Sequence, residues 1–131
     1  MDIEVTLTGG ERVEAQVGKH RIVTDQNGSA PKPFNLFLAS IATCSGIYVA
    51  RFCEKRKIPT DGVRIRQRSV KNPDTKMIER IEISIELPES FPDKYRDAVK
   101  RAVGQCTVKK HLEQSPSIEV TTATAPLASH C

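Results

Sequence analysis

The sequence has no tryptophan and few aromatic residues of any kind, with two tyrosines and four phenylalanines among 131 residues. Single-stranded nucleic acids are often held by bases stacked on aromatic side chains, so this scarcity argues against a nucleic-acid-binding module. A large excess of one charge is also lacking, because 20 lysines and arginines oppose 16 acidic residues and leave a net charge of +4. The charge balance therefore does not require a polyanionic partner.

Signals for export and for membrane insertion are missing as well. The first residues, MDIEVTLTGGERVEAQ, contain no basic region followed by an apolar run, so they do not resemble a signal peptide. The most apolar stretch, residues 34–53, is interrupted by six polar, glycine or charged residues. A bilayer span needs a continuous apolar run of about 20 residues. We therefore expect a cytoplasmic protein without membrane contact.

The chain has the length of one domain, and we expect residues 1–131 to form a single one. Apolar and polar residues alternate over residues 3–7 and 13–17, on either side of a Gly-Gly pair. This pattern predicts a β-hairpin, and a third short strand is predicted over residues 21–24.

The rest of the chain alternates between helical and strand patterns. Residues 34–53 are apolar on all sides and predict a buried helix, and residues 63–68 and 81–87 predict a second hairpin. A second long helix is expected over residues 90–113, followed by a last strand at 118–120. The order β-β-β-α-β-β-α-β indicates an α+β fold with largely antiparallel sheets. Because one sheet covers only one side of an all-apolar helix, we expect a homodimer.

Four cysteines, at positions 44, 53, 106 and 131, are the candidates for chemistry. None forms a Cys-x-x-Cys pair and the three histidines do not complete a zinc signature, so neither a metal nor another cofactor is expected. In a reducing cytosol such cysteines are free or redox-active rather than a disulfide framework. Cys44 lies on the first predicted helix and Cys106 on the apolar stripe of the second, so both face the interior. The simpler interpretation is that these cysteines, like Cys53 and Cys131, act as small hydrophobic residues.

Two segments together resemble the OsmC/Ohr family: PKPFNLFLASIATC, which leads into the first helix, and GQCTVKKHLE later in the chain. The N-terminal hairpin with its Gly-Gly pair and nearby arginine, and the strand IEISIELP, extend the resemblance over nearly the whole chain. The resemblance implies an intertwined homodimer whose two central helices are wrapped by sheets. It also implies a thiol peroxidase that reduces organic hydroperoxides.

By this resemblance, Cys44 corresponds to the thiol that attacks the peroxide and Cys106 to the resolving thiol that closes a disulfide. Arg12, with Arg21 as the alternative, corresponds to the arginine that stabilises the thiolate. A cation is needed there because burial in an apolar helix disfavours the thiolate. A dithiol reductant would return the disulfide to its two thiols.

The resemblance also implies a substrate pocket, with one departure from the family. Phe34 and Asn35 stand where family members have a glutamate that orients the arginine, so we expect a weaker site. Asn35 could still accept a hydrogen bond from a guanidinium. Phe37 and Tyr48 are expected to line the pocket with Asn35, around the organic part of the substrate.

Two other functions compete with the peroxidase. The first is a non-catalytic protein of the same fold that binds a small apolar ligand at the dimer interface. The second is nucleic-acid binding through Arg64, Arg66 and Arg68, which share one strand face. That face is more simply explained as a solvated surface balanced by Glu82 and Glu86 on the neighbouring strand.

Overall fold

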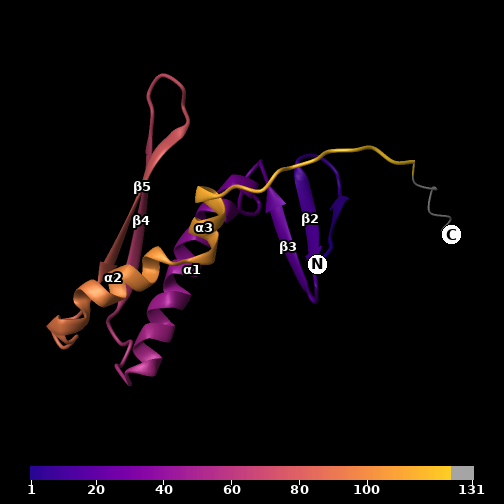
Figure 1. Cartoon of the computed structure of the whole chain (residues 1–131). Helices are drawn as coiled ribbons and strands as arrows, with labels where there is room; N and C mark the ends of the chain where they lie inside the picture. The colour runs from indigo at the N-terminus through magenta and orange to yellow at the C-terminus, as the bar shows by residue number, and fades with distance from the viewer. Residues whose placement is uncertain (125–131) are drawn as a thin grey trace.

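The structure is a computed structural model that describes residues 1–124. It contains five strands and four helical segments (Figure 1): β1 Ile3–Leu7, β2 Arg12–Val17, β3 His20–Asp25, α1 Pro33–Lys55, β4 Arg64–Lys71, β5 Ile78–Glu86, the 3-10 turn η1 Asp93–Tyr95, α2 Arg96–Gly104 and α3 Thr107–Glu113. Both sheets are antiparallel. The predicted α+β class is therefore confirmed.

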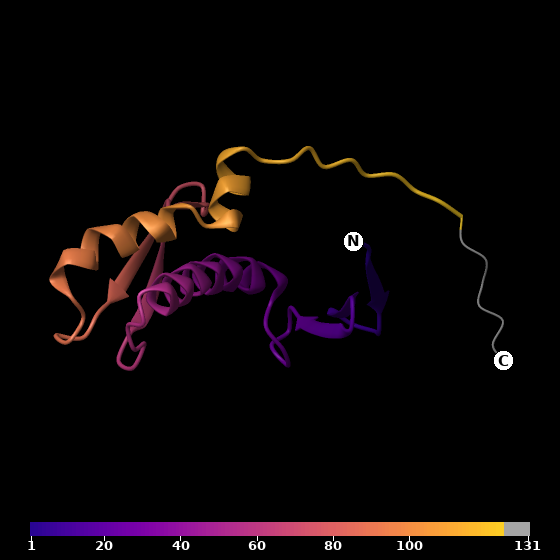
Figure 2. The ribbon, with the colours of Figure 1, turned by 60° about the horizontal axis from the view of Figure 1, so that its bottom comes forward.

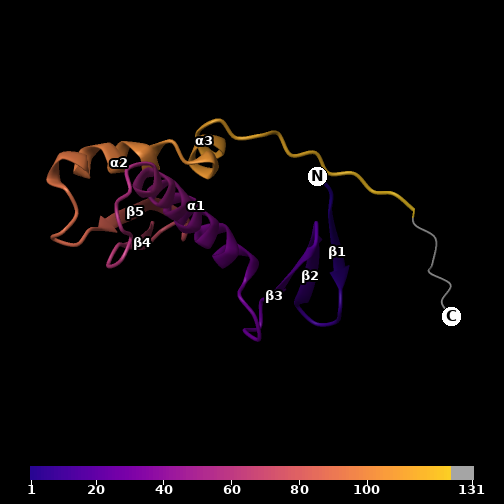
Figure 3. The same ribbon diagram turned by 90° about the horizontal axis from the view of Figure 1, so that it is seen from below.

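The N-terminal sheet has the strand order β1-β2-β3 and turns at the predicted Gly-Gly pair. Gly9 and Gly10 have φ angles of 108° and 58°, a region that side chains with a Cβ rarely adopt. Figure 3 shows this sheet apart from the helices. As a result the apolar side chains of β1 lie uncovered, and Leu7 is 80% exposed.

The core lies where α1, α2 and the β4–β5 hairpin meet. Val49, Phe52 and Cys53 of α1 pack with Phe91, Val99 and Val103 around α2, and Figure 2 shows the two helices side by side. The hairpin is fastened to α1 by the Gln67 side chain, whose Nε2 donates to the Leu38 carbonyl at 2.9 Å.

One face of α1 is buried in this core, and other parts of the helix are not covered. Phe34, Phe37 and Ile47 remain exposed. The helix ends in a Schellman arrangement, in which the Ile58 amide donates to the Cys53 carbonyl at 2.9 Å. Lys57 takes the left-handed position, with φ 54°, that glycine usually occupies.

The predicted second helix differs from the observed one. It opens as the turn η1, continues as α2 and stops at Gly104 before α3 begins at Thr107. Cys106 is therefore not on a continuous helical stripe, as the sequence predicted, but caps α3 at the break. Apolar residues continue at helical spacing across the break, so periodicity alone does not locate it.

The predicted strand at residues 118–120 is not formed. Residues 114–124 follow an extended path without regular structure, and Ile118 and Val120 are more than four-fifths exposed. A strand requires a neighbour to accept and donate its backbone hydrogen bonds, and this segment has none within the described chain.

Helix α1 is also long and apolar enough, by length and composition, to cross a membrane. The six polar, glycine or charged residues within residues 34–53 therefore do not by themselves exclude a membrane span. One face of the helix packs against α2, α3 and β4.

Candidate active site at the break between two helices

The structure brings Cys44 and Cys106 together. Cys44 lies in the middle of α1 and is partly exposed, whereas Cys106 is fully buried at the start of α3. Both are free thiols, and the Cys106 side chain is among the groups that lower the pKa of Cys44. The turn that follows α2 places Cys106, because its amide donates to the Val103 carbonyl at 3.1 Å. The two side chains therefore lie close together although they are 62 positions apart in the sequence.

The surroundings of Cys44 favour its thiolate. Burial alone raises the pKa of Cys44, but hydrogen bonds and charge outweigh it. The Cys106 thiol and the backbone N–H groups of Val108 and Thr107 donate to the sulfur, and the positive charge of Lys109 lies nearby. The net effect is a Cys44 pKa below the ordinary value for a thiol.

Two contacts hold α3 in the position that this environment requires. The Lys109 ammonium donates to the Val103 carbonyl at 3.1 Å, which ties α3 to the end of α2. The hydroxyls of Tyr48 and Thr107 are hydrogen-bonded at 3.1 Å, which ties α3 to α1. Because Tyr48 is one helical turn after Cys44, the second contact lies next to the sulfur.

The arginine predicted to stabilise the thiolate lies elsewhere in the chain. Arg12 is on β2, where its Nη1 donates to the Ser29 hydroxyl at 3.2 Å and its Nε is 3.6 Å from the Glu14 carboxylate. The alternative, Arg21, also pairs with Glu14, at 3.2 Å. Within one chain, neither arginine is among the groups that influence Cys44.

Arg12 is held by a small polar network at the end of β3. The Ser29 hydroxyl donates to the Asp25 carboxylate, and the Asn27 amide donates to the same side chain at 2.8 Å. The hydrogen bonds from Ser29 and Asn27, with the charge of Arg12, lower the pKa of Asp25 although burial opposes them. An acidic residue thus supports Arg12 through Ser29, even though the chain lacks the glutamate expected by resemblance.

Of the three predicted pocket residues, only Tyr48 borders the cysteine pair. Phe37 packs against Phe34, with ring centroids 5.4 Å apart, and both line a separate groove beside Met77 of the β4–β5 hairpin. Asn35 is exposed in the first turn of α1, where its amide donates to a backbone carbonyl. Neither Phe37 nor Asn35 is among the hydrogen-bonding or charged groups that shift the pKa of Cys44.

The sequence does not reveal the groups of α3 that lower the pKa of Cys44. Its pattern places Thr107, Val108 and Lys109 in the interior of a continuous helix. Gly104, a poor helix former shortly before Cys106, was the only signal that the helix could restart there. No group of three or more potential metal-binding side chains is found within residues 1–124.

The fold and the thiol site define a class of α+β proteins with a cysteine pair between the central helix and a helical break. Comparison with family models finds a match to OsmC-like protein over residues 26–121, and the chain belongs to this family. The resemblance seen in the sequence is thereby confirmed. A search of curated proteins found no match.

Solved structures of similar fold come from several bacteria. A protein from Psychrobacter arcticus 273-4, described as an osmotic stress induced and detoxification response protein, is 22% identical, with a TM-score of 0.70 over 82% of this chain and 85% of that one. A hypothetical protein from Aquifex aeolicus VF5 is 21% identical (TM-score 0.65, 87% of both chains). An OsmC-like protein from Mycoplasma pneumoniae is 15% identical (TM-score 0.64, 87% of both chains). At these identities the likeness establishes the fold.

Proposed function

We propose that the protein is a thiol peroxidase that reduces organic hydroperoxides through Cys44 and Cys106. The observation that supports this function best is the pair of free thiols, in which the pKa of Cys44 is lowered. A thiolate is the nucleophile that peroxide reduction needs. A role in detoxification agrees with the description of the Psychrobacter relative.

The reaction divides into three steps. The Cys44 thiolate attacks the outer oxygen of the hydroperoxide; the O–O bond breaks, the alkoxide takes up a proton and leaves as an alcohol, and Cys44 becomes a sulfenic acid. The Cys106 sulfur then attacks Cys44, so that an S–S bond forms and water leaves. Finally an external dithiol reduces this disulfide and is itself oxidised. The last step requires a reducing compartment, which suits the cytoplasmic location we propose.

The amide and lysine environment replaces part of what an arginine would supply. The two backbone N–H groups at the start of α3 and the Lys109 charge already favour the Cys44 thiolate. They lie beside the Cys44 sulfur, which becomes negatively charged when the thiol loses its proton. This explains how a family member without the glutamate can retain a reactive thiol.

The test is consumption of cumene hydroperoxide in the presence of a dithiol. We expect turnover by the wild type and a loss of at least about a thousandfold in Cys44→Ser, because a serine hydroxyl does not replace a thiolate in attack on a peroxide. Cys53→Ser, which changes the second cysteine of α1, is the control and retains turnover. No turnover by the wild type would contradict the proposal. A Cys44 that also resists alkylation would then favour the non-catalytic ligand-binding function.

Cys106→Ser separates the two cysteine roles. This variant should complete one turnover and accumulate the Cys44 sulfenic acid, because no neighbouring thiol can close the disulfide. Trapping with dimedone and intact-mass measurement would detect the product. Equal multiple-turnover rates in Cys106→Ser and the wild type would show that Cys106 does not resolve the intermediate.

We also propose that the working unit is a homodimer. The uncovered apolar side chains of β1, with Leu7 the most exposed, and the exposed Phe34 and Ile47 of α1 support this assembly. Within one chain, Arg12 is held by Ser29 and Glu14, away from Cys44. In a dimer, the Arg12 of a second copy could approach Cys44 instead.

Light scattering should give roughly twice the chain mass of 14.5 kDa. Co-refolding Cys44→Ser with Arg12→Gln tests the role of Arg12. Mixed dimers should recover turnover above either variant alone, since one of their two sites combines an intact Cys44 with an intact Arg12. A monomer, or a mixture no more active than its components, would contradict this arrangement.

A further inference from the structure

Helix α3 begins beside Cys106 but has little packing of its own. It has seven residues, Thr107–Glu113, and none of them is buried. Leu112, its largest apolar side chain, is 48% exposed. A helix this short is not stable in isolation, so its position depends on its contacts with other elements. The fully buried Cys106 therefore lies next to a segment that packing alone does not hold.

Within residues 1–124, two side-chain hydrogen bonds join α3 to other helices. The Lys109 ammonium donates to the Val103 carbonyl at 3.1 Å and so reaches back to α2, the element directly before α3 in the chain. The hydroxyls of Tyr48 and Thr107, 3.1 Å apart, join α3 to α1 across 59 positions of sequence. Of the two contacts, only the second fixes α3 to the helix that carries Cys44.

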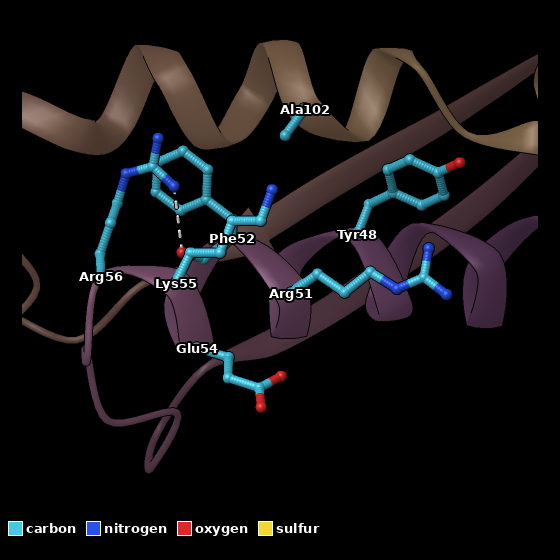
Figure 4. A pocket seen from close by; sticks show the side chains of 7 residues that line it. All are labelled: Tyr48, Arg51, Phe52, Glu54, Lys55, Arg56 and Ala102. Atoms are coloured by element: carbon cyan, nitrogen blue, oxygen red, sulfur yellow. Dashed lines mark hydrogen bonds between the residues drawn. The ribbon is translucent and has the colours of Figure 1, made fainter.

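The place of Tyr48 on α1 suits it to this contact. Tyr48 follows Cys44 by four residues, so the two side chains lie on the same face of the helix, one turn apart. Figure 4 shows the Tyr48 ring between α1 and the helix that carries Ala102, with the hydroxyl at the end away from Phe52. The Arg51 guanidinium lies 5.7 Å from the centre of the ring. A tyrosine side chain has only two torsions to fix, so its hydroxyl is held in place at a low cost in entropy.

The position of α3 matters most once Cys44 has been oxidised, because two reactions then compete for the sulfenic acid. In one, the Cys106 sulfur attacks Cys44, the S–S bond forms and water leaves. In the other, the sulfenate sulfur attacks the outer oxygen of a second hydroperoxide and the O–O bond breaks. The alkoxide takes up the hydroperoxide proton and leaves as an alcohol, and Cys44 becomes a sulfinic acid that a dithiol does not reduce. Only the first reaction requires α3 to be in place.

We propose that Tyr48 is a positioning residue that holds the start of α3 against α1, through its hydrogen bond to Thr107, and so keeps Cys106 within reach of the oxidised Cys44. The inference rests on the proposed peroxidase function and adds the residue that favours disulfide formation over overoxidation. Tyr48 does not react; it acts through Thr107. Without the Tyr48 hydroxyl, α3 moves away more often and the sulfenic acid stays open to a second hydroperoxide for longer.

Modification of the buried Cys106 measures the position of α3 without any turnover. In a Cys44→Ser background, iodoacetamide reaches Cys106 when α3 moves away and reaches Cys53 when the core opens. Tyr48→Phe should raise the Cys106 rate about threefold, as expected for the loss of one exposed hydrogen bond, and leave the Cys53 rate unchanged. Tyr95→Phe removes the only other tyrosine hydroxyl of the chain and is the matched control, with both rates at the background value.

Thr107 supplies a rescue in the same background. Thr107→Val removes the hydroxyl but keeps the branched shape, and should raise the Cys106 rate as Tyr48→Phe does. Thr107→Ser keeps the hydroxyl and should match the background. Because the two hydroxyls form one hydrogen bond, Tyr48→Phe/Thr107→Val should be no faster than either single variant.

Three results would overturn the inference. The first is an unchanged Cys106 rate in Tyr48→Phe. The second is a rise of the Cys106 and Cys53 rates by the same factor, because the hydroxyl would then stabilise the whole fold and not the position of α3. The third is a double variant in which the effects of Tyr48→Phe and Thr107→Val multiply, because each hydroxyl would then act independently of the other.

Overoxidation supplies the second measurement, in chains that keep Cys44. After exposure to excess cumene hydroperoxide with a dithiol, intact mass gives the fraction of sulfinic acid. This fraction should be about threefold higher in Tyr48→Phe and Thr107→Val than in the wild type, Thr107→Ser and Tyr95→Phe. Equal fractions in Tyr48→Phe and the wild type would overturn the role of Tyr48 in the cycle. A wild type that does not consume cumene hydroperoxide contradicts the peroxidase itself, and the Cys106 modification rates then still decide whether Tyr48 positions α3.

Discussion

Two positions of α1 carry the same residue in opposite chemical settings. In the middle of the helix, Cys44 is partly exposed and has a lowered pKa. Nine residues later, near the end of the helix, Cys53 is fully buried in the core, and burial raises its pKa although the charge of Arg56 offsets part of the effect. Burial acts in the same direction on both thiols. The difference arises because Cys44 receives hydrogen bonds from α3 and from Cys106, whereas Cys53 packs among apolar side chains.

This contrast shows that a helix can position a reactive and an inert cysteine on opposite sides. A separation of nine residues turns the side chain by about 180° around the helix axis. One side of α1 thus faces the donors at the break between α2 and α3, and the other faces the core. Reactivity is assigned by the neighbouring element, not by α1 itself.

The largest expected effect is on alkylation. Iodoacetamide at pH 7 should modify Cys44 at least about a hundredfold faster than Cys53, because Cys44 forms thiolate at lower pH and Cys53 is protected until the core opens. Raising the pH should increase the Cys44 rate until its thiolate fraction saturates, below the pH at which an ordinary thiol saturates. Mass spectrometry of the two peptides measures both rates, and equal rates would remove the contrast.

Stability should show the reverse order. Cys53→Ser places a hydroxyl in the apolar core and should lower the free energy of unfolding by about 1–3 kcal/mol. Cys44→Ser, at a partly exposed position, should cost less than about 1 kcal/mol. Denaturant unfolding at one fixed protein concentration gives both values. If Cys44→Ser lowered the free energy of unfolding more than Cys53→Ser does, the cysteine pair would contribute more to stability than the packing of Cys53 in the core.

The smallest effect concerns Lys109. Lys109→Gln keeps a group able to donate to the Val103 carbonyl but removes the positive charge, so the pKa of Cys44 should rise. Alkylation of Cys44 at pH 7 should slow by about two- to fivefold, as expected for a fraction of a pKa unit. Lys110→Gln removes a charge from the neighbouring exposed position and is the control. An unchanged Cys44 rate in Lys109→Gln would assign the lowered pKa to hydrogen bonds alone.

Regular patterns predicted the two antiparallel sheets and the central helix, although the strand predicted at residues 118–120 is not formed. Apolar and polar residues alternate with a period of two on both sides of Gly9–Gly10, and this glycine pair is the one turn signal between them. The first hairpin could therefore be predicted. Pro33, at the first position of α1, and the apolar run behind it identified that helix. The sequence also predicted that Cys44 and Cys106 face the same interior, and the Cys106 side chain is among the groups that lower the pKa of Cys44.

The remaining features depend on contacts that a sequence pattern does not encode. One glycine, Gly104, lowers helix propensity too little to mark the end of a helix. The sequence pattern therefore places Cys106 within a helix and not at a break. The acidity of Cys44 depends on backbone amides, which every residue except proline carries. The motif that suggested Arg12 identifies a residue type but not where the fold places it.

The break at Cys106 links the oxidation state of the cysteine pair to the hydrogen bonds at the start of α3. Under the proposed cycle, Cys44 loses its negative charge when the disulfide forms. The first amides of α3 then lose a charged hydrogen-bond acceptor, whereas the hydrogen bonds and packing of the core do not change. Under that cycle the oxidised and reduced forms of the chain would differ at the start of α3 and not in the core.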